Sequence, residues 1–208
     1  MPDKFQYKKA LSKKILSLIP FNYYWRLLPY AYLRTRSDIS KSKLFETRFS
    51  LYEYLFEGKK NKEIILLEFG TFKGESLRKF CELNDNVSSV FYSFDTFVGL
   101  PTDWHSTKKG HFDVGGNVPQ IEDKRVSYQI GLFRDTFFEF IKNTELNKDN
   151  TEIFIHIDSD LFSSVVTVLP CLIGYYKLDN FTLIYDEFTG DEAVMHQFIE
   201  QIFDEHKF

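Results

Sequence analysis

The feature that most constrains the fold of this chain is an alternation of short apolar segments with segments of helical periodicity, which begins at residue 64. Five apolar runs have the length of strands and are bounded by turn residues: 64–69, 89–95, 125–130, 152–158 and 180–187. Four segments between and after them have the length and pattern of helices: 74–83, 135–145, 163–176 and 191–206. Continuous apolar strands joined by helices predict a parallel sheet that is covered on both faces. We therefore expect an α/β domain with a doubly wound, mostly parallel sheet.

Two segments do not fit this regular alternation. Pro170 lies inside the segment 163–176 and predicts that this helix is kinked or divided into two. Residues 98–124 form a 27-residue connection with four Gly, two Pro and little periodicity. Loops of this length in compact domains are mostly functional lids or disordered segments. We favour a lid, because the connection contains bulky rings that are unusual in a solvated linker: Trp104, His105, His111 and Phe112.

Charge is distributed unevenly along the 208 residues, whose formal net charge is -4. Residues 1–48 carry 11 Lys and Arg against 3 Asp and Glu, and their amphipathic pattern predicts a basic helical arm before a domain over residues 49–208. The arm would pack on the domain or on a second subunit, as in a homodimer, with binding to a membrane surface as the alternative. The acidic composition of the domain argues against binding to nucleic acid.

The sequence also bears on the compartment in which the protein works. No apolar run has the length of a transmembrane helix. Lys13 and Lys14 interrupt any apolar block near the N-terminus that would act as a signal peptide. The two cysteines, Cys81 and Cys171, lie in half-apolar helical stretches and are too few for a disulfide framework. We therefore expect a cytoplasmic protein.

A glycine turn joins the first strand to its helix in the stretch LLEFGTFKGES, residues 66–76. Gly70 and Gly74 allow the backbone to approach a ligand closely, and the amides at the start of the helix would point toward that ligand. Asp95 ends the next strand, in the position where an acidic residue accepts hydrogen bonds from ribose hydroxyls. The dinucleotide fingerprint and the phosphate-binding loop are both absent from the sequence. The series favours an adenosine-type cofactor, with a plain tight turn as the alternative.

Carboxylates follow two strands of the predicted sheet. Asp158 and Asp160 end the fourth strand, and Asp186 and Glu187 end the fifth. The carboxyl ends of parallel strands meet at one edge of the sheet, where ligands bind in open α/β folds. Converging carboxylates repel one another, and oxygen ligands without a nearby Cys favour Mg²⁺ over Mn²⁺ or Ca²⁺ as the cation that relieves this repulsion. The alternative is that the first two only cap the next helix. We interpret His156, inside the fourth strand, as a histidine of the core, with a role as a ligand as the alternative.

Five short motifs occur in the same order as in the macrocin O-methyltransferase family of class I S-adenosylmethionine-dependent methyltransferases: EFGTFKGES, FDTFVGLP, GLFRDT, HIDSDLFSS and YDEFTG. The resemblance covers roughly residues 45–200 and does not include the basic arm. Members of that family methylate sugar hydroxyls on natural products. The resemblance therefore implies a Rossmann-like methyltransferase fold, S-adenosylmethionine and Mg²⁺ as cofactors, and a small-molecule hydroxyl acceptor such as a sugar.

The resemblance also implies roles for individual residues. Asp158, Asp186 and Glu187 would hold Mg²⁺, and Asp160 would act as the general base. The glycine turn would contact the methionine part of the cofactor through Glu68, Gly70, Thr71, Gly74 and Ser76. Asp95 would hold the ribose, and Gly131 would lie on the adenine side.

The chain departs from the family pattern in two places. Phe162 stands where the family often has Tyr, and no antiparallel strand pair follows the last predicted helix, so that pair is expected to be absent or truncated. Two other functions stay open. One is methylation of a catechol or another vicinal diol, and the other is binding of S-adenosylmethionine without catalysis.

Overall fold

The computed structural model describes residues 42–104, 106–146, 151–176 and 181–186. The chain divides into two units, Phe45–Asp186 and a second unit that combines Met1–Leu44 with Glu187–Phe208. Of the second unit, residues 42–44 are described, and they form no helix or strand. Residues 1–41 of the predicted basic arm, the predicted helix 191–206, Glu187 and the end of the domain lie outside the described residues.

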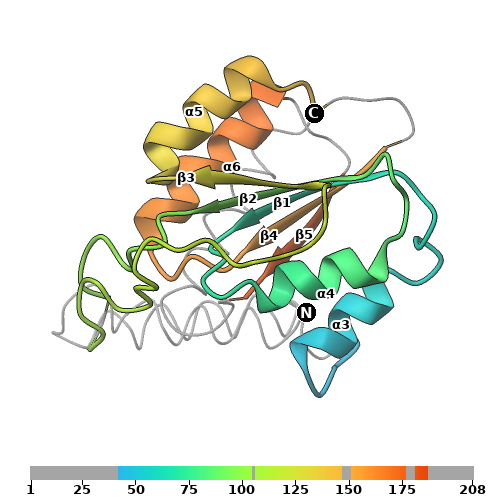
Figure 1. Cartoon of the computed structure of the whole chain (residues 1–208), viewed down its shortest axis with the longest axis horizontal. Coiled ribbons are helices and arrows are strands. Elements are labelled where there is room, and N and C mark those ends of the chain that lie inside the picture. Colours follow the sequence, from blue (N-terminus) through green and yellow to red (C-terminus); the bar gives the residue numbers. More distant parts are fainter. Residues whose placement is uncertain (1–41, 105, 147–150, 177–180, 187–208) are drawn as a thin grey trace, which may run out of the picture. The chain divides into compact units, whose positions relative to one another are not determined.

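Five strands form the sheet in the order β3-β2-β1-β4-β5 (Figure 1). Their bounds are β1 (Ile64–Phe69), β2 (Val90–Asp95), β3 (Val126–Ile130), β4 (Glu152–Ile157) and β5 (Thr182–Tyr185). Every pairing between these strands is parallel. Because the order reverses between β3 and β4, β1 and β4 are neighbours and their carboxyl ends lie at one edge. The predicted doubly wound parallel sheet is confirmed.

Helices cover both faces of this sheet (Figure 1). One face carries α3 (Arg48–Leu55) and α4 (Glu75–Leu83), and the other carries α5 (Phe133–Asn143) and α6 (Phe162–Tyr176). The helix α6 continues through Pro170, which excludes its division into two helices. Among the helices that the structure describes, none is both long and apolar enough to span a membrane.

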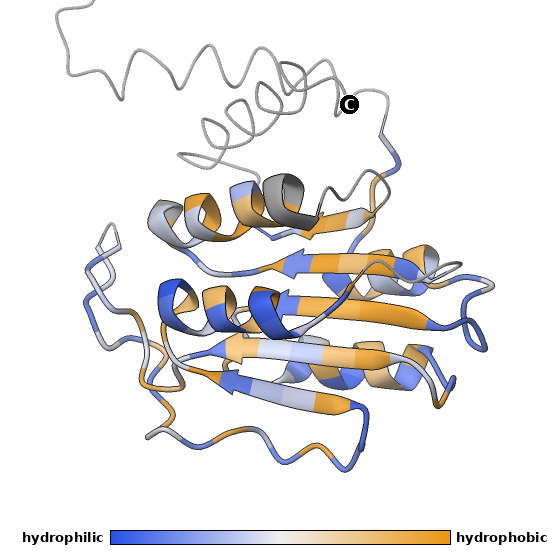
Figure 2. Cartoon of the chain, turned by 90° about the horizontal axis from the view of Figure 1, so that it is seen from above, coloured by the Kyte–Doolittle hydropathy of each residue, from blue (hydrophilic) through white to orange (hydrophobic). Residues whose placement is uncertain are grey.

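The core is built on both faces of β1, and Figure 2 shows apolar residues concentrated in the strands. All six residues of β1 are buried. Ile64 and Leu66 belong to an apolar cluster with residues of α3 and α4, whereas Phe69 packs edge-on against Phe137 of α5 at 5.2 Å between ring centroids. Side chains alternate along a strand, so Glu68 shares the face of Ile64 and Leu66 and lies inside the core.

The helix α3 was not identified from the sequence as an element of the domain. The predicted boundary between arm and domain, after residue 48, falls at its first residue. The helix begins after Thr47, whose side chain accepts a hydrogen bond from the amide of Ser50. Tyr52 and Phe56 are almost completely buried in the cluster with β1 and α4. With only eight residues, α3 is too short for its periodicity to stand out from the segment before it.

The connection between β2 and β3, residues 96–125, is long and irregular as expected, but it folds back on itself. The amide of Leu100 donates to the carbonyl of His111 and the amide of Gly110 donates to the carbonyl of Leu100, both at 2.9 Å. Val98 and Asp113 form an isolated antiparallel bridge. The loop is therefore braced by its own main chain. Its role as a lid stays a prediction, and His105 lies outside the described residues.

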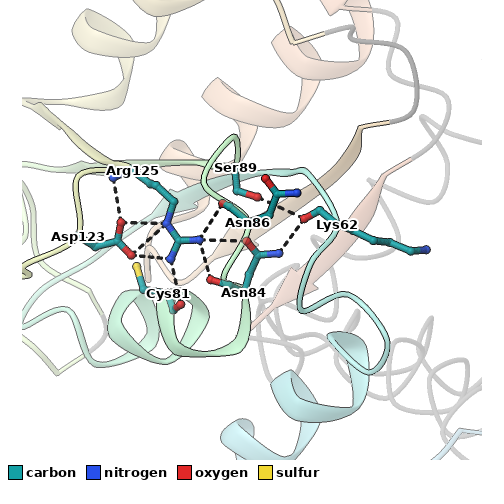
Figure 3. A network of polar contacts seen from close by, with 7 residues as sticks. All are labelled: Lys62, Cys81, Asn84, Asn86, Ser89, Asp123 and Arg125. Atoms are coloured by element: carbon teal, nitrogen blue, oxygen red, sulfur yellow. Dashed lines mark hydrogen bonds and ion pairs between the residues drawn. The ribbon is translucent and has the colours of Figure 1, made fainter.

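Arg125 fastens the end of this loop to the end of α4 (Figure 3). Its Nη2 donates to Asp123 Oδ2 at 2.6 Å and to the carbonyl of Cys81 at 3.1 Å. Its Nη1 donates to the carbonyl of Asn84 at 2.6 Å, and its guanidinium lies 4.7 Å from the ring centroid of Phe91. The side chains of Arg125 and Asp123 are 15% and 18% exposed. This network joins the start of β3 to the end of α4, at the edge of the sheet opposite the carboxyl ends of the strands.

Arg125→Ala is therefore expected to lower the free energy of unfolding by about 3 kcal/mol, because it leaves a half-buried carboxylate and helix-terminal carbonyls without their donor. Urea unfolding followed by circular dichroism measures this loss. Lys108→Ala is the matched control, since it breaks an ion pair with Asp103 at 2.7 Å that is exposed on both sides, and it should leave stability unchanged. Equal stability of the two variants would contradict a structural role for the network.

Candidate active site

The glycine turn between β1 and α4 is packed between the ends of two other strands. The amide of Gly70 donates to the carbonyl of Phe94, and the amide of Asp158 donates to the carbonyl of Phe69, both at 2.9 Å. Gly70 has φ +94°, and a Cβ at this position would overlap the main-chain oxygen of Asp158. Glycine is required at position 70 mainly because the main chain at the end of β4 lies so close that no side chain would fit. The glycine turn is thus in direct contact with the end of β4, where the predicted metal ligand Asp158 lies.

Asp95, at the end of β2, holds the turn through its carboxylate. Its Oδ2 accepts hydrogen bonds from the amides of Thr71 and Phe72, and its Oδ1 accepts one from the amide of Phe97, each at 2.8 Å. Phe72 and Phe97 both have left-handed φ angles, 49° and 56°, which are unfavourable for bulky residues and cluster at functional sites. The structure brings Asp95 to the turn, and its Oδ1, which accepts only one of these three bonds, keeps a lone pair that can accept from a ribose.

The loop 96–125 contacts the turn at two places. The ring of Phe112 meets the ring of Phe72 edge-on, with 5.3 Å between centroids, and both side chains are about a third exposed, at 37% and 36%. A Cβ at Gly74, the first position before α4, would lie 2.9 Å from the Cβ of Pro119. No sequence pattern indicates these contacts, because the residues on the two sides are about 40 positions apart.

The other predicted cofactor residues divide into two groups. The amide of Gly131 donates to the carbonyl of Asp95 at 2.9 Å, which brings it to the same edge. Glu68 and Ser76 instead point into the core, with exposed fractions of 0% and 7%. Glu68 Oε2 accepts from Thr71 Oγ1 at 3.0 Å, and Glu68 Oε1 lies 3.2 Å from His156 Nδ1. Both oxygens of Glu68 therefore have internal partners.

Two of the predicted metal ligands, Asp158 and Asp186, directly follow β4 and β5. The amide of Asp186 donates to the carbonyl of Ile157, which precedes Asp158. Burial raises the pKa of Asp158 to about 6, and the charge of Asp186 acts in the same direction. Asp160 follows with a left-handed φ of 57°. Among the described residues no group of three or more His, Cys, Asp or Glu side chains could hold a metal ion; Glu187, the third predicted ligand, lies outside them.

Arg48, at the start of α3, is a residue of this region that the sequence analysis missed. Its Nη1 lies 4.0 Å from Asp158 Oδ2, and its Nη2 donates to Glu75 Oε2 at 2.8 Å. The guanidinium offsets part of the negative charge at the carboxyl edge. Arg48 is the last residue of the predicted basic arm, and no spacing rule connects it with an aspartate 110 positions later.

Asp158→Asn is expected to raise the melting temperature at about pH 8 and to change it little at about pH 4. The pKa of Asp158 in the folded chain, about 6, exceeds its ordinary value of 3.8, so the native state binds its proton more tightly than the unfolded chain does. Stability is therefore lost as the pH rises through this interval, and an uncharged Asn removes that loss. Thermal unfolding at the two pH values tests this. A variant that melts below the wild type at about pH 8 would contradict it.

Comparison with known proteins bears on the fold. No family model and no curated protein matches the sequence. Among solved structures, the chain is similar to CalS11, a calicheamicin methyltransferase, with a TM-score of 0.52 and 18% identity over 97% of this chain and 84% of that chain. At this identity the similarity shows a shared fold, and it agrees with the predicted α/β fold. The closer resemblance to macrocin O-methyltransferases stays a prediction.

Proposed function

We propose that this chain is an S-adenosylmethionine-dependent O-methyltransferase. The observation that carries the proposal is the joining of the glycine turn to Asp95 at the carboxyl edge of the sheet, where open α/β folds bind their ligands. The fold shared with a calicheamicin methyltransferase supports it. Two acidic residues, Asp158 and Asp160, follow the strand whose end touches the turn.

The described residues fit an adenosine-type cofactor. Asp95 would accept from the ribose hydroxyls, Gly131 would lie beside the adenine, and the main chain around Gly70 and Gly74 would face the methionine part. Thr71 is 6% exposed and its hydroxyl is taken up inside the protein, so its amide and main chain define the turn. Glu68 and Ser76 would support the turn from below. The bound cofactor supplies an electrophilic methyl group on a sulfonium.

The carboxylates at the ends of β4 and β5 suit a divalent cation. Burial and the charge of Asp186 oppose ionisation of Asp158, and a cation would relieve both. Oxygen donors without a nearby Cys favour Mg²⁺. We propose that Asp158 and Asp186, together with Glu187, hold Mg²⁺, which would lower the pKa of a neighbouring hydroxyl as a Lewis acid.

The remaining chemistry falls to the chain itself. A sugar hydroxyl is protonated at neutral pH, and we propose that Asp160 takes its proton as the methyl group is transferred. The turn and the ends of β4 and β5 would hold the hydroxyl and the methyl group in line, which replaces a bimolecular encounter by a preorganised one. The loop 96–125, which already rests on the turn through Phe112, would exclude water.

Transfer of a labelled methyl group tests this function. The full chain is incubated with methyl-labelled S-adenosylmethionine and panels of sugars, glycosides and catechols, each with Mg²⁺ or with a chelator. The proposal expects labelled ethers of sugar hydroxyls, formed faster with Mg²⁺. Labelling confined to catechols would replace the acceptor class by vicinal diols. Binding of the cofactor without transfer to any acceptor would favour a non-catalytic binding protein.

A further inference from the structure

A row of buried polar side chains crosses the sheet directly beneath the glycine turn. In the strand register Glu68 of β1 lies between Ser93 of β2 and His156 of β4. All three residues are 0% exposed. Such groups cost free energy in an apolar core unless each has a hydrogen-bond partner. Their placement at one level of three adjacent strands therefore requires a compensating network.

The first half of that network leads up to the turn. The hydroxyls of Ser93 and Thr71 lie 2.6 Å apart. Thr71 Oγ1 donates to Glu68 Oε2 at 3.0 Å. The side chain of Thr71 thus points down into the core, while its amide donates to Asp95 Oδ2 at 2.8 Å on the ligand side. Thr71 is the residue through which the buried row and the turn are connected.

The second half leads to α3. His156 Nδ1 lies 3.2 Å from Glu68 Oε1, and His156 Nε2 lies 3.1 Å from the hydroxyl of Tyr52. That hydroxyl is also 3.5 Å from Ser76 Oγ at the start of α4. Tyr52 is 1% exposed, and its ring packs on Phe80 with 4.5 Å between centroids. The phenol is therefore held in place by α4 on one side and by the histidine on the other.

One assignment of protons satisfies every member of the network. With Glu68 as a carboxylate and His156 as a neutral imidazole, His156 donates to Glu68 through Nδ1–H, and its Nε2 accepts from the phenol of Tyr52. Burial raises the pKa of Tyr52 to about 12, so its phenol keeps the proton that it donates. Removing the phenol oxygen would leave His156 Nε2 buried without its donor, and the imidazole and Glu68 would then rearrange.

We propose that Tyr52 is a positioning residue for the cofactor turn. Through His156 and Glu68 its hydroxyl fixes the side chain of Thr71, and through Thr71 it fixes the turn on which the cofactor rests. The inference rests on the proposed function, because it gives the turn a ligand. It makes α3, which precedes the first strand, a supporting element of the site.

Binding of S-adenosylhomocysteine to the full chain, measured by calorimetry, tests the proposal. Tyr52→Phe keeps the ring and is expected to weaken binding by about 10-fold, a typical size for coupling between sites. Ser89→Ala is the matched control: Ser89 is 2% exposed, and its Oγ accepts from the amide of Ile64 at 3.0 Å at the amino end of the same sheet. The control should lose thermal stability and keep its affinity. Equal affinity of Tyr52→Phe and wild type would overturn the proposal.

A double-mutant cycle separates positioning from a general loss of stability. Thr71→Val breaks the link to Glu68, so adding Tyr52→Phe to it should weaken binding little further, whereas Thr71→Ser keeps the hydroxyl and should keep the Tyr52 effect. The same fold-loss in both backgrounds would overturn the proposal.

Three further outcomes are distinguished. If Tyr52→Phe does not fold, the Nδ1–H resonance of His156 in the NMR spectrum of the wild type is measured instead. The proposal expects this resonance to shift when S-adenosylhomocysteine saturates the protein. An unchanged resonance would contradict the proposal. A wild-type chain that folds but does not bind S-adenosylhomocysteine removes the proposed function, and the inference with it. Binding by the wild type with no effect of Tyr52→Phe removes the inference alone.

Discussion

Gly70→Ala is expected to destabilise the domain by more than about 4 kcal/mol, because it combines two of the mechanisms that produce unusually large losses, overpacking and backbone strain. A methyl group at this position would overlap the main-chain oxygen of Asp158, and φ is +94°. Neither β1 nor β4 can retreat, because the two strands are paired along their whole length. The variant should therefore be found largely in the unfolded or insoluble fraction.

Gly58→Ala is the control for backbone strain alone. Its φ of +73° is also left-handed, but nothing lies within 4 Å of the Cβ position. We expect it to cost about 1 kcal/mol, the penalty of a left-handed residue with a Cβ. The soluble yield and the urea unfolding curve, compared between the two variants, separate the two contributions. Equal stability of the two variants would show that the end of β4 does not press on the turn.

Asp160→Asn is expected to lower the rate of methyl transfer by about 10²- to 10⁴-fold, the range supplied by a general base. Asparagine tolerates the left-handed region as well as aspartate does, so the φ of 57° at this position should be retained. Affinity for S-adenosylhomocysteine should stay within about 2-fold of the wild type, because the change removes a proton acceptor and no contact that the cofactor requires.

Single-turnover assays with labelled S-adenosylmethionine measure this effect. Asp135→Asn is the control, since Asp135 lies at the start of α5 and its side chain is 67% exposed. That variant should transfer methyl groups at the wild-type rate. A wild-type rate in Asp160→Asn would remove the general-base role, whereas loss of cofactor binding in the same variant would assign Asp160 to the binding of the cofactor.

The strands were predictable because their apolar runs are continuous. The prediction for β1 agrees at both ends, and those for β2 and β4 agree to within one residue. The fifth run was expected over residues 180–187 but β5 spans Thr182–Tyr185, since an apolar composition does not show where pairing stops. Burial on both faces also hides direction: β1 has no polar alternation that would show which way Glu68 points.

The site was predictable at the level of the sheet edge and less so at the level of side chains. The rule that parallel strands share a carboxyl edge placed Asp95, Asp158 and the glycine turn together. The pairing of Glu68 with His156, 88 residues later, has no local signal. Gly70 was expected to admit a ligand, and the structure shows that it admits the end of β4. Contacts of this kind depend on tertiary packing, which spacing does not encode.

The central claim is that the glycine turn and Asp95 form a site for S-adenosylmethionine, and equilibrium binding to the full chain tests it most directly. Calorimetric titration with S-adenosylmethionine and S-adenosylhomocysteine should give one site per chain with a Kd below about 100 µM, and saturation should raise the melting temperature by mass action. A folded chain that binds neither ligand at about ten times that concentration would contradict the account.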